Sequence, residues 1–191
     1  MLYAQSAGVL NKINMEILHK ICLLILLISV ILITNSVTNA QQQEKPCSSS
    51  EATQFDFWTG EWILDWQNAE GKTDYGKNTV IKKLGGCVIE ENFSDDNKTF
   101  SGQSVSVYNT NKKQWQQTWV DDAGGYMNFT GEFSDGKMTL SRKVTGKTGN
   151  EISQRMVFYD ITPNEFYWTW ESSTDDGKTW KVNWKIHYKR K

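Results

Sequence analysis

The sequence predicts an all-β domain, folded as an up-and-down antiparallel barrel of about ten strands that follows a short helical turn. From residue 61 onward, β-branched and aromatic residues alternate with polar ones over short runs, and Gly, Asn and Asp separate the runs. The gaps between runs are shorter than the dozen or more residues that a parallel crossover needs. Neighbouring strands are therefore expected to pair as antiparallel hairpins.

Ten runs are expected to form strands. They cover residues 61–67, 76–83, 87–94, 100–108, 114–120, 126–133, 137–144, 151–160, 165–172 and 179–189. Without a helical layer, the sheet must bury one face on itself, and closure into a barrel also removes the exposed strand edges. A two-sheet sandwich is the alternative, but Greek-key links need longer connections than this sequence offers.

The segment before the first strand predicts one helical turn, over residues 51–58 (EATQFDFW), with Ser50 as its cap. Glycines mark the tight hairpins that follow. Gly71, Gly136 and Gly177 stand after Glu or Asp, where a hairpin needs a positive φ.

The first 40 residues have the pattern of an export signal. Lys12 and Lys20 precede an apolar run over residues 21–33, and the segment ends in the small residue Ala40. The alternative is an uncleaved membrane anchor, but the run is shorter than the roughly 18 to 20 residues needed to cross a bilayer. We expect cleavage after Ala40 and a periplasmic or secreted protein with no membrane segment.

Three parts of the chain are thus expected. Residues 1–40 form the signal peptide, in which the stretch before Met15 is a candidate upstream extension. Residues 41–50 form a flexible polar arm, and residues 51–191 form a single barrel domain. Cys47 and Cys87 remain after cleavage, and in an oxidising compartment they are expected to form a disulfide, the alternative being two buried thiols.

Charge and composition exclude several function classes. The formal net charge is −1 and the basic residues are scattered among acidic ones, so no basic stripe for nucleic acid is present. His187 is the one histidine left after cleavage, which leaves zinc sites and Ser-His-Asp or Cys-His systems without their residues. We expect no metal, no cofactor and no nucleic-acid partner.

Four motifs in order resemble one family of exported bacterial proteins. They are FDFWTGEW (residues 55–62), LGGCVIEENF (84–93), WQQTWVDDAGG (115–125) and WESSTDDGKTW (170–180). The family is catalogued as a domain of unknown function and is grouped with calycin-like, or lipocalin-like, barrels. The resemblance implies a barrel of about ten strands over residues 47–189, and it implies no activity.

Two more distant resemblances concern single motifs. Gly60-Glu61-Trp62 is a fragment of the signature of nitrobindin-type barrels, which bind haem through a histidine near the last strand. Here alternation places His187 on the outward polar face, opposite Trp184 and Ile186, so haem binding is not expected. Residues 173–180 (STDDGKTW) are similar to the Asp box of sialidase-like propellers, and we interpret them as a tight hairpin with Trp180 packed over the turn.

Aromatic residues are the strongest anomaly, with nine Trp, seven Tyr and eight Phe. Alternation groups several tryptophans with polar residues on one strand face, which is typical of a cavity for a small, mostly apolar ligand. The expected lining is Trp62, Trp115, Gln117, Trp119, Trp168 and Trp170, with Glu90 or Arg155 as polar anchors. The alternative is that these rings only fill a small barrel.

Two other functions stay open from the sequence. Glu90 and Asp121 are candidates for the acid and base of a hydrolase acting on a sugar or another neutral substrate, provided that they face each other across a site. Paired acidic residues at strand ends are otherwise ordinary surface charge. The third hypothesis is a carbohydrate- or partner-docking module that uses exposed tryptophans as a flat platform.

Overall fold

A computed structural model describes Met15, residues 17–26 and residues 47–191 of the chain. Residues 17–26 are helical. Within these described parts, no helix is long and apolar enough to cross a membrane. Most of the predicted signal segment and polar arm (residues 1–40 and 41–50) lies outside the described residues, so both stay predictions.

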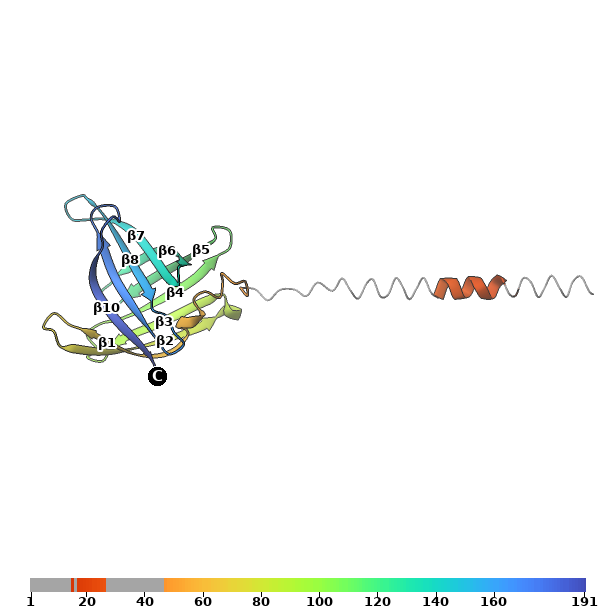
Figure 1. Ribbon diagram of the computed structural model, residues 1–191, viewed down its shortest axis with the longest axis horizontal. Coiled ribbons are helices and arrows are strands. Elements are labelled where there is room, and N and C mark those ends of the chain that lie inside the picture. The colour runs from red at the N-terminus through yellow and green to blue at the C-terminus, as the bar shows by residue number, and fades with distance from the viewer. Residues whose placement is uncertain (1–14, 16, 27–46) are drawn as a thin grey trace, which may run out of the picture. The chain divides into compact units, whose positions relative to one another are not determined.

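The domain is a closed barrel of ten antiparallel strands, which confirms the predicted fold class (Figure 1). Each strand pairs with its neighbours in sequence, and β1 also pairs with β10 to close the barrel. The strands are β1 (Gly60–Gln67), β2 (Thr73–Lys83), β3 (Val88–Asp95), β4 (Ser101–Asn109), β5 (Gln114–Asp121), β6 (Tyr126–Ser134), β7 (Lys137–Thr145), β8 (Glu151–Tyr159), β9 (Glu165–Ser173) and β10 (Lys181–Arg190).

Two strands start two or more residues away from their expected positions, and turn chemistry explains both. β2 begins at Thr73, because the Asn68 side chain accepts backbone hydrogen bonds from Glu70 and Lys72 and so tightens the β1–β2 turn. β10 begins late, because the Thr179 N–H bonds the Asp175 carboxylate at 2.9 Å within the preceding turn.

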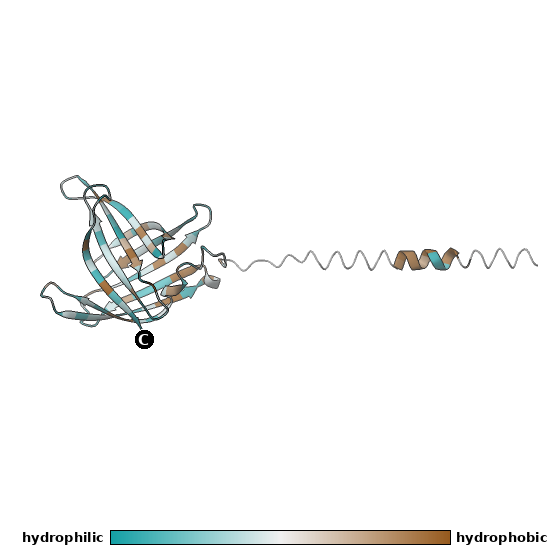
Figure 2. Ribbon diagram, in the orientation of Figure 1, coloured by the Kyte–Doolittle hydropathy of each residue, from teal (hydrophilic) through white to brown (hydrophobic). Residues whose placement is uncertain are grey.

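Period-two alternation places one face of each strand inside the barrel. In β3 every second residue is buried, beginning with Ile89 and ending with Asp95. Figure 2 shows hydrophobic and hydrophilic positions alternating along the strands. In β10 a register shift between Val182 and Trp184 interrupts this alternation and leaves Val182 exposed.

A short plug closes one end of the barrel. It consists of the 3-10 helix η1 (Asp56–Trp58) and the buried ring of Phe55, which contacts Trp115 and Phe158 at centroid distances of 5.2 and 5.1 Å. Trp115 is near the start of β5 and Phe158 near the end of β8, and in an antiparallel meander these positions lie at the same end. The turn that precedes η1 is capped by Ser49, which accepts a bond from Ala52 N, and not by Ser50 as expected.

The predicted disulfide is present between Cys47 and Cys87. It joins the first described residue of the domain to the segment between η2 (Leu84–Gly86) and β3, across 40 residues of sequence. A structural disulfide is typical of proteins outside the cytoplasm.

Candidate functional site

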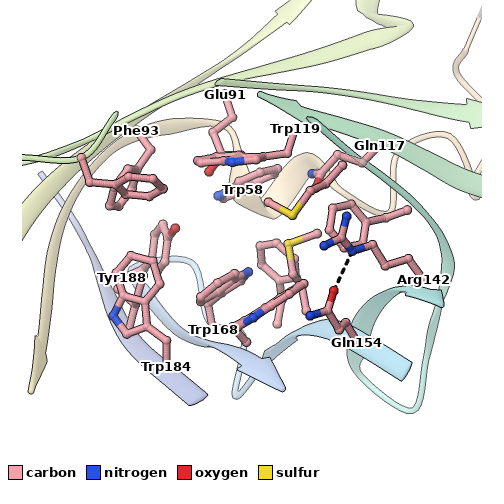
Figure 3. Close-up of a pocket in the computed structure, with 17 residues that line it drawn as sticks. Trp58, Glu91, Phe93, Gln117, Trp119, Arg142, Gln154, Trp168, Trp184 and Tyr188 are labelled. Carbon is pink, nitrogen blue, oxygen red and sulfur yellow. Dashed lines mark hydrogen bonds between the residues drawn. The ribbon is translucent and has the colours of Figure 1, made fainter. Parts of the chain in front are cut away.

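The barrel contains a cavity of about 380 Å³ above the plug (Figure 3). Its walls come from η1, from the residue before β4, and from β3 and β5 to β10. The lining residues are Trp58, Glu91, Phe93, Phe100, Gln117, Trp119, Met127, Phe129, Arg142, Gln154, Met156, Phe158, Trp168, Trp170, Trp184, Ile186 and Tyr188.

The aromatic walls are built from rings that meet edge to face. Trp168 and Trp184 lie 5.7 Å apart between ring centroids, and Phe129 and Trp170 lie 5.8 Å apart, both nearly perpendicular. Such contacts hold each ring against its neighbour and leave flat faces toward the cavity. The arrangement offers a rigid apolar surface with few polar groups.

Four of the predicted ligand-binding residues line this cavity: Gln117, Trp119, Trp168 and Trp170. The Gln117 amide nitrogen donates to Ser106 Oγ at 2.9 Å, and the Trp119 indole nitrogen donates to Asp121 Oδ2 at 3.0 Å. These bonds fix the side chains on the inner face of β5. Alternation along β5 and β9 was therefore sufficient to find them.

Trp62 and Trp115 are inside the barrel but do not line the cavity, which corrects the expectation that they belong to its lining. The Trp62 indole donates to Trp58 O at 2.8 Å, and the Trp115 indole donates to Gln54 Oε1 at 3.3 Å. Both side chains are almost fully buried against the plug. Their position is structural, because they seal the closed end.

Glu90 and Arg155 lie on the outer face, so neither is a polar anchor inside the barrel. Glu90 pairs with Lys83 at 3.4 Å. Arg155 pairs with Glu171 at 2.6 Å and stacks on the Trp180 ring with its guanidinium carbon 3.9 Å from the centroid. Adjacent residues of a strand point to opposite faces, and the inward neighbours here are Glu91, Gln154 and Met156.

The hydrolase pair is also not assembled. Asp121 shares the face of Trp119 and caps the β5–β6 turn, where it accepts the Gly125 N–H at 2.7 Å. The hydrogen bond from Trp119, followed by that from Gly125, lowers the pKa of Asp121. Glu90 is on the other side of the barrel wall, so the two carboxylates cannot flank one substrate.

Glu91 is the buried carboxyl of the cavity, and the sequence analysis missed it. Asn78 Nδ2 and Ser104 Oγ each donate to it at 2.6 Å, one to each carboxyl oxygen. Asn78 Nδ2 is also 3.2 Å from the Tyr188 hydroxyl. Burial raises the pKa of Glu91 to about 7, against the opposing effect of the bonds from Ser104 and Asn78.

Arg142 is the cation of the cavity, and it too was missed. Its Nε donates to Gln154 Oε1 at 2.8 Å, and its guanidinium carbon lies 5.3 Å from the Phe129 ring centroid and 5.9 Å from that of Trp170. The sequence could have placed Arg142 inside the barrel, because Arg142 follows the fully buried Met138 and Leu140 at intervals of two residues. Figure 3 shows Arg142 beside Gln154, with Glu91 on a different part of the wall.

Two lining residues keep buried polar atoms without a hydrogen-bond partner: Gln117 Oε1 and Trp58 Nε1. Buried polar atoms are normally paired, so these two atoms are exceptions at the wall of the cavity. Across the part of the chain that the structure describes, no three or more His, Cys, Asp and Glu side chains gather as a metal site would require.

The residues on the outer wall concern two other hypotheses, which are haem binding through His187 and a docking platform of exposed tryptophans. His187 lies on it as expected, stacked on Tyr167 at 4.5 Å between ring centroids and bonded to Glu165 at 3.0 Å. All nine tryptophans fall within residues 47–191, and none of them is exposed. A platform of exposed tryptophans is therefore not formed in this domain.

In comparisons with known proteins, no protein-family model and no curated protein sequence matches this chain. The resemblance to the calycin-like family therefore stays a prediction from the motifs. The assignment of a function depends on the geometry of the cavity.

Proposed function

We propose that this protein is an exported binding protein that holds a small, mostly apolar molecule inside its barrel. The observation that carries the proposal is the aromatic cavity of about 380 Å³, closed at one end by the η1 plug. Ligand pockets are typically concave, mainly apolar and provided with a few fixed polar groups. This cavity has those properties.

The size of the cavity favours a binding site over a core. Protein interiors pack as densely as organic crystals, and few voids in them exceed one water molecule. An empty apolar cavity costs stability, because its lining atoms lose their packing contacts. A bound molecule in contact with Trp119, Trp168 and Trp170 recovers those contacts.

Export is supported by two independent features. The charged and apolar pattern of residues 1–40 is typical of a signal peptide. The Cys47–Cys87 disulfide is of the kind that persists in oxidising compartments. Both are consistent with a periplasmic or secreted protein.

Binding of 1-aminoanthracene, an apolar dye that fluoresces more strongly in apolar surroundings, tests the proposal. The intact domain is expected to bind the dye at one saturable site. Met127→Trp places a larger ring in the cavity wall and is expected to abolish binding. Val105→Trp adds the same ring on the exposed outer face of β4 and is expected to leave binding unchanged.

The two variants decide the location of the dye. Circular dichroism and thermal unfolding establish that each variant is folded before its binding is compared. Dye binding that survives Met127→Trp, or that Val105→Trp removes, places the dye outside the barrel and contradicts the proposal.

A further inference from the structure

We infer that the ligand carries a carboxylate and that the guanidinium of Arg142 binds this group inside the barrel. This inference depends on the proposed binding function and specifies its ligand class. It starts from the fact that Arg142 is a cation in an aromatic wall. No carboxylate of the described residues forms an ion pair with it.

The position of Arg142 is fixed by its strand and by one neighbour. It follows Met138 and Leu140 on the inner face of β7, in the half of the strand away from the plug. The bond from its Nε to Gln154 Oε1, 2.8 Å long, orients the guanidinium. The two terminal nitrogens are the pair of donors that fit a carboxylate in a bidentate manner.

The other two arginines of the chain each have charged or hydrogen-bonding partners for their guanidinium groups. Arg155 is paired with Glu171 and stacked on Trp180. Arg190 donates to the carbonyl oxygens of three residues: Phe57, Thr59 and Pro163. Among the residues that the structure describes, Arg142 has the bond to Gln154 and the ring faces of Phe129 and Trp170, and no further interaction is found.

A charge next to apolar surface is costly unless an opposite charge or hydrogen bonds compensate it. Ring faces compensate part of the cost through cation–π attraction, but they do not accept the remaining N–H groups. The described part of the chain offers no carboxylate for this role, because the Glu91 carboxyl is occupied by Asn78 and Ser104 and forms no ion pair with Arg142. A carboxylate on the ligand supplies both the charge and the acceptors.

The strand register gives the orientation of such a ligand. Gln117 pairs with Phe129 across β5 and β6, and the guanidinium carbon of Arg142 lies 5.3 Å from the Phe129 ring centroid, so polar groups of β5 and β7 flank one ring. The carboxylate is thus held in the half of the barrel away from η1. The apolar body then extends toward Trp58 and Phe158 at the plug. The ligand class is an apolar monocarboxylic acid, with an alkyl or aromatic body.

Isothermal titration with octanoate and octan-1-ol, at a pH where octanoate is ionised, tests this inference. The two probes have the same alkyl length and differ in the charged group. The wild-type domain is expected to bind octanoate about tenfold or more tightly than octan-1-ol, since hydrogen bonds to a charged group contribute that much. Arg142→Met is expected to remove this preference by weakening octanoate binding more than octan-1-ol binding.

Two further variants keep the test decisive. Arg155→Met removes a cation from the outer wall and is expected to leave the preference for octanoate intact. Arg142→Lys keeps the charge without the bidentate fork and is expected to retain part of the preference, which provides a second reading if Arg142→Met does not fold.

The outcomes separate this inference from the proposed function. Equal wild-type affinity for the two probes, or an equal loss of both in Arg142→Met, overturns the role of Arg142 and leaves the binding function standing. If neither probe nor 1-aminoanthracene binds the wild-type domain, the proposed function itself fails.

Discussion

The side chains of Asn78 and Glu91 are joined by a hydrogen bond of 2.6 Å between Nδ2 and Oε1, inside the barrel on adjoining strands β2 and β3. Ser104 Oγ holds the other carboxyl oxygen at 2.6 Å. The three side chains belong to three consecutive strands, and both Asn78 and Ser104 are 1 % exposed. This network keeps a carboxyl group at the wall of an apolar cavity, where its ionisation is costly.

Glu91 is expected to make the stability of the fold depend on pH. Its folded-state pKa of about 7 is raised from 4.5, so the folded state retains a proton that the unfolded chain releases between these values. The stabilisation from this protonated carboxyl is fully present below pH 4.5 and is lost as the pH rises to about 7, by roughly 3 kcal/mol in total. Urea unfolding at pH 5 and pH 8 measures this loss.

Glu91→Gln provides the control for that measurement. The amide does not ionise, so the free energy of unfolding of this variant is expected to change less between pH 5 and pH 8 than that of the wild type. If the difference between variant and wild type is the same at both pH values, Glu91 does not titrate as described.

Gly102 is expected to be needed for the position of Trp119. A Cβ at residue 102 would overlap the Trp119 indole, which lies across β4 on the inner face. Gly102→Ala is therefore expected to cost about 1 to 3 kcal/mol of stability, typical of overpacking, and to weaken 1-aminoanthracene binding. In a Trp119→Leu background the same substitution is expected to cost much less, and an equal cost in both backgrounds would exclude this contact as the cause.

The Cys47–Cys87 disulfide is expected to stabilise the domain through its unfolded state. Closing a loop of 40 residues corresponds to about 4 kcal/mol in the chain-entropy description. The double variant Cys47→Ser/Cys87→Ser is therefore expected to unfold at lower urea concentration than the oxidised wild type. Adding a reductant is expected to lower the midpoint of the wild type only. A wild-type midpoint that reductant leaves unchanged would contradict the prediction.

Asp175 is expected to hold the turn between β9 and β10. Its carboxylate accepts bonds from the Thr179 hydroxyl and N–H and from the Ser173 hydroxyl, and these bonds lower its pKa to about 2. The stabilisation is present above the usual pKa of 3.8 and is lost as the pH falls through 2. Asp175→Asn is expected to lower the melting temperature at pH 7.

Asp176 is the matched control for this turn. Its carboxylate contacts only the exposed Lys143 among the described side chains, at 2.8 Å, and surface ion pairs contribute little. Asp176→Asn is thus expected to change the melting temperature at pH 7 less than Asp175→Asn does. The opposite order would show that Asp175 is not the residue that organises the turn.

The two-residue alternation of apolar and polar residues predicted most of the fold, because a closed antiparallel meander is determined by local sequence patterns. Strand alternation and short turns are visible in the sequence, and so was the outward position of His187. The prediction of Glu90 as the inward carboxylate was wrong. The alternation along β3 indicates Glu91 instead, because Glu91 shares one face with Ile89 and Phe93.

Other errors came from properties that alternation does not contain. Trp62 and Trp115 point inward, but their depth relative to the plug depends on how the segment around Phe55 folds back into the barrel. Arg155 shares a face with Val157, which is 8 % exposed on the outer wall. Trp180 stacks on Arg155 at that wall. Part of the outer face of β8 is therefore covered, and its sequence resembles that of a face that points into the core.

The indole N–H signals of the nine tryptophans, followed by NMR during titration with 1-aminoanthracene, test the central claim most directly, because they report where the ligand sits. We expect the signals of Trp119, Trp168 and Trp170 in the cavity to shift to saturation, while that of Trp180 on the outer wall stays in place. Shifts confined to Trp180, or cavity signals unmoved while the dye is bound, would contradict it.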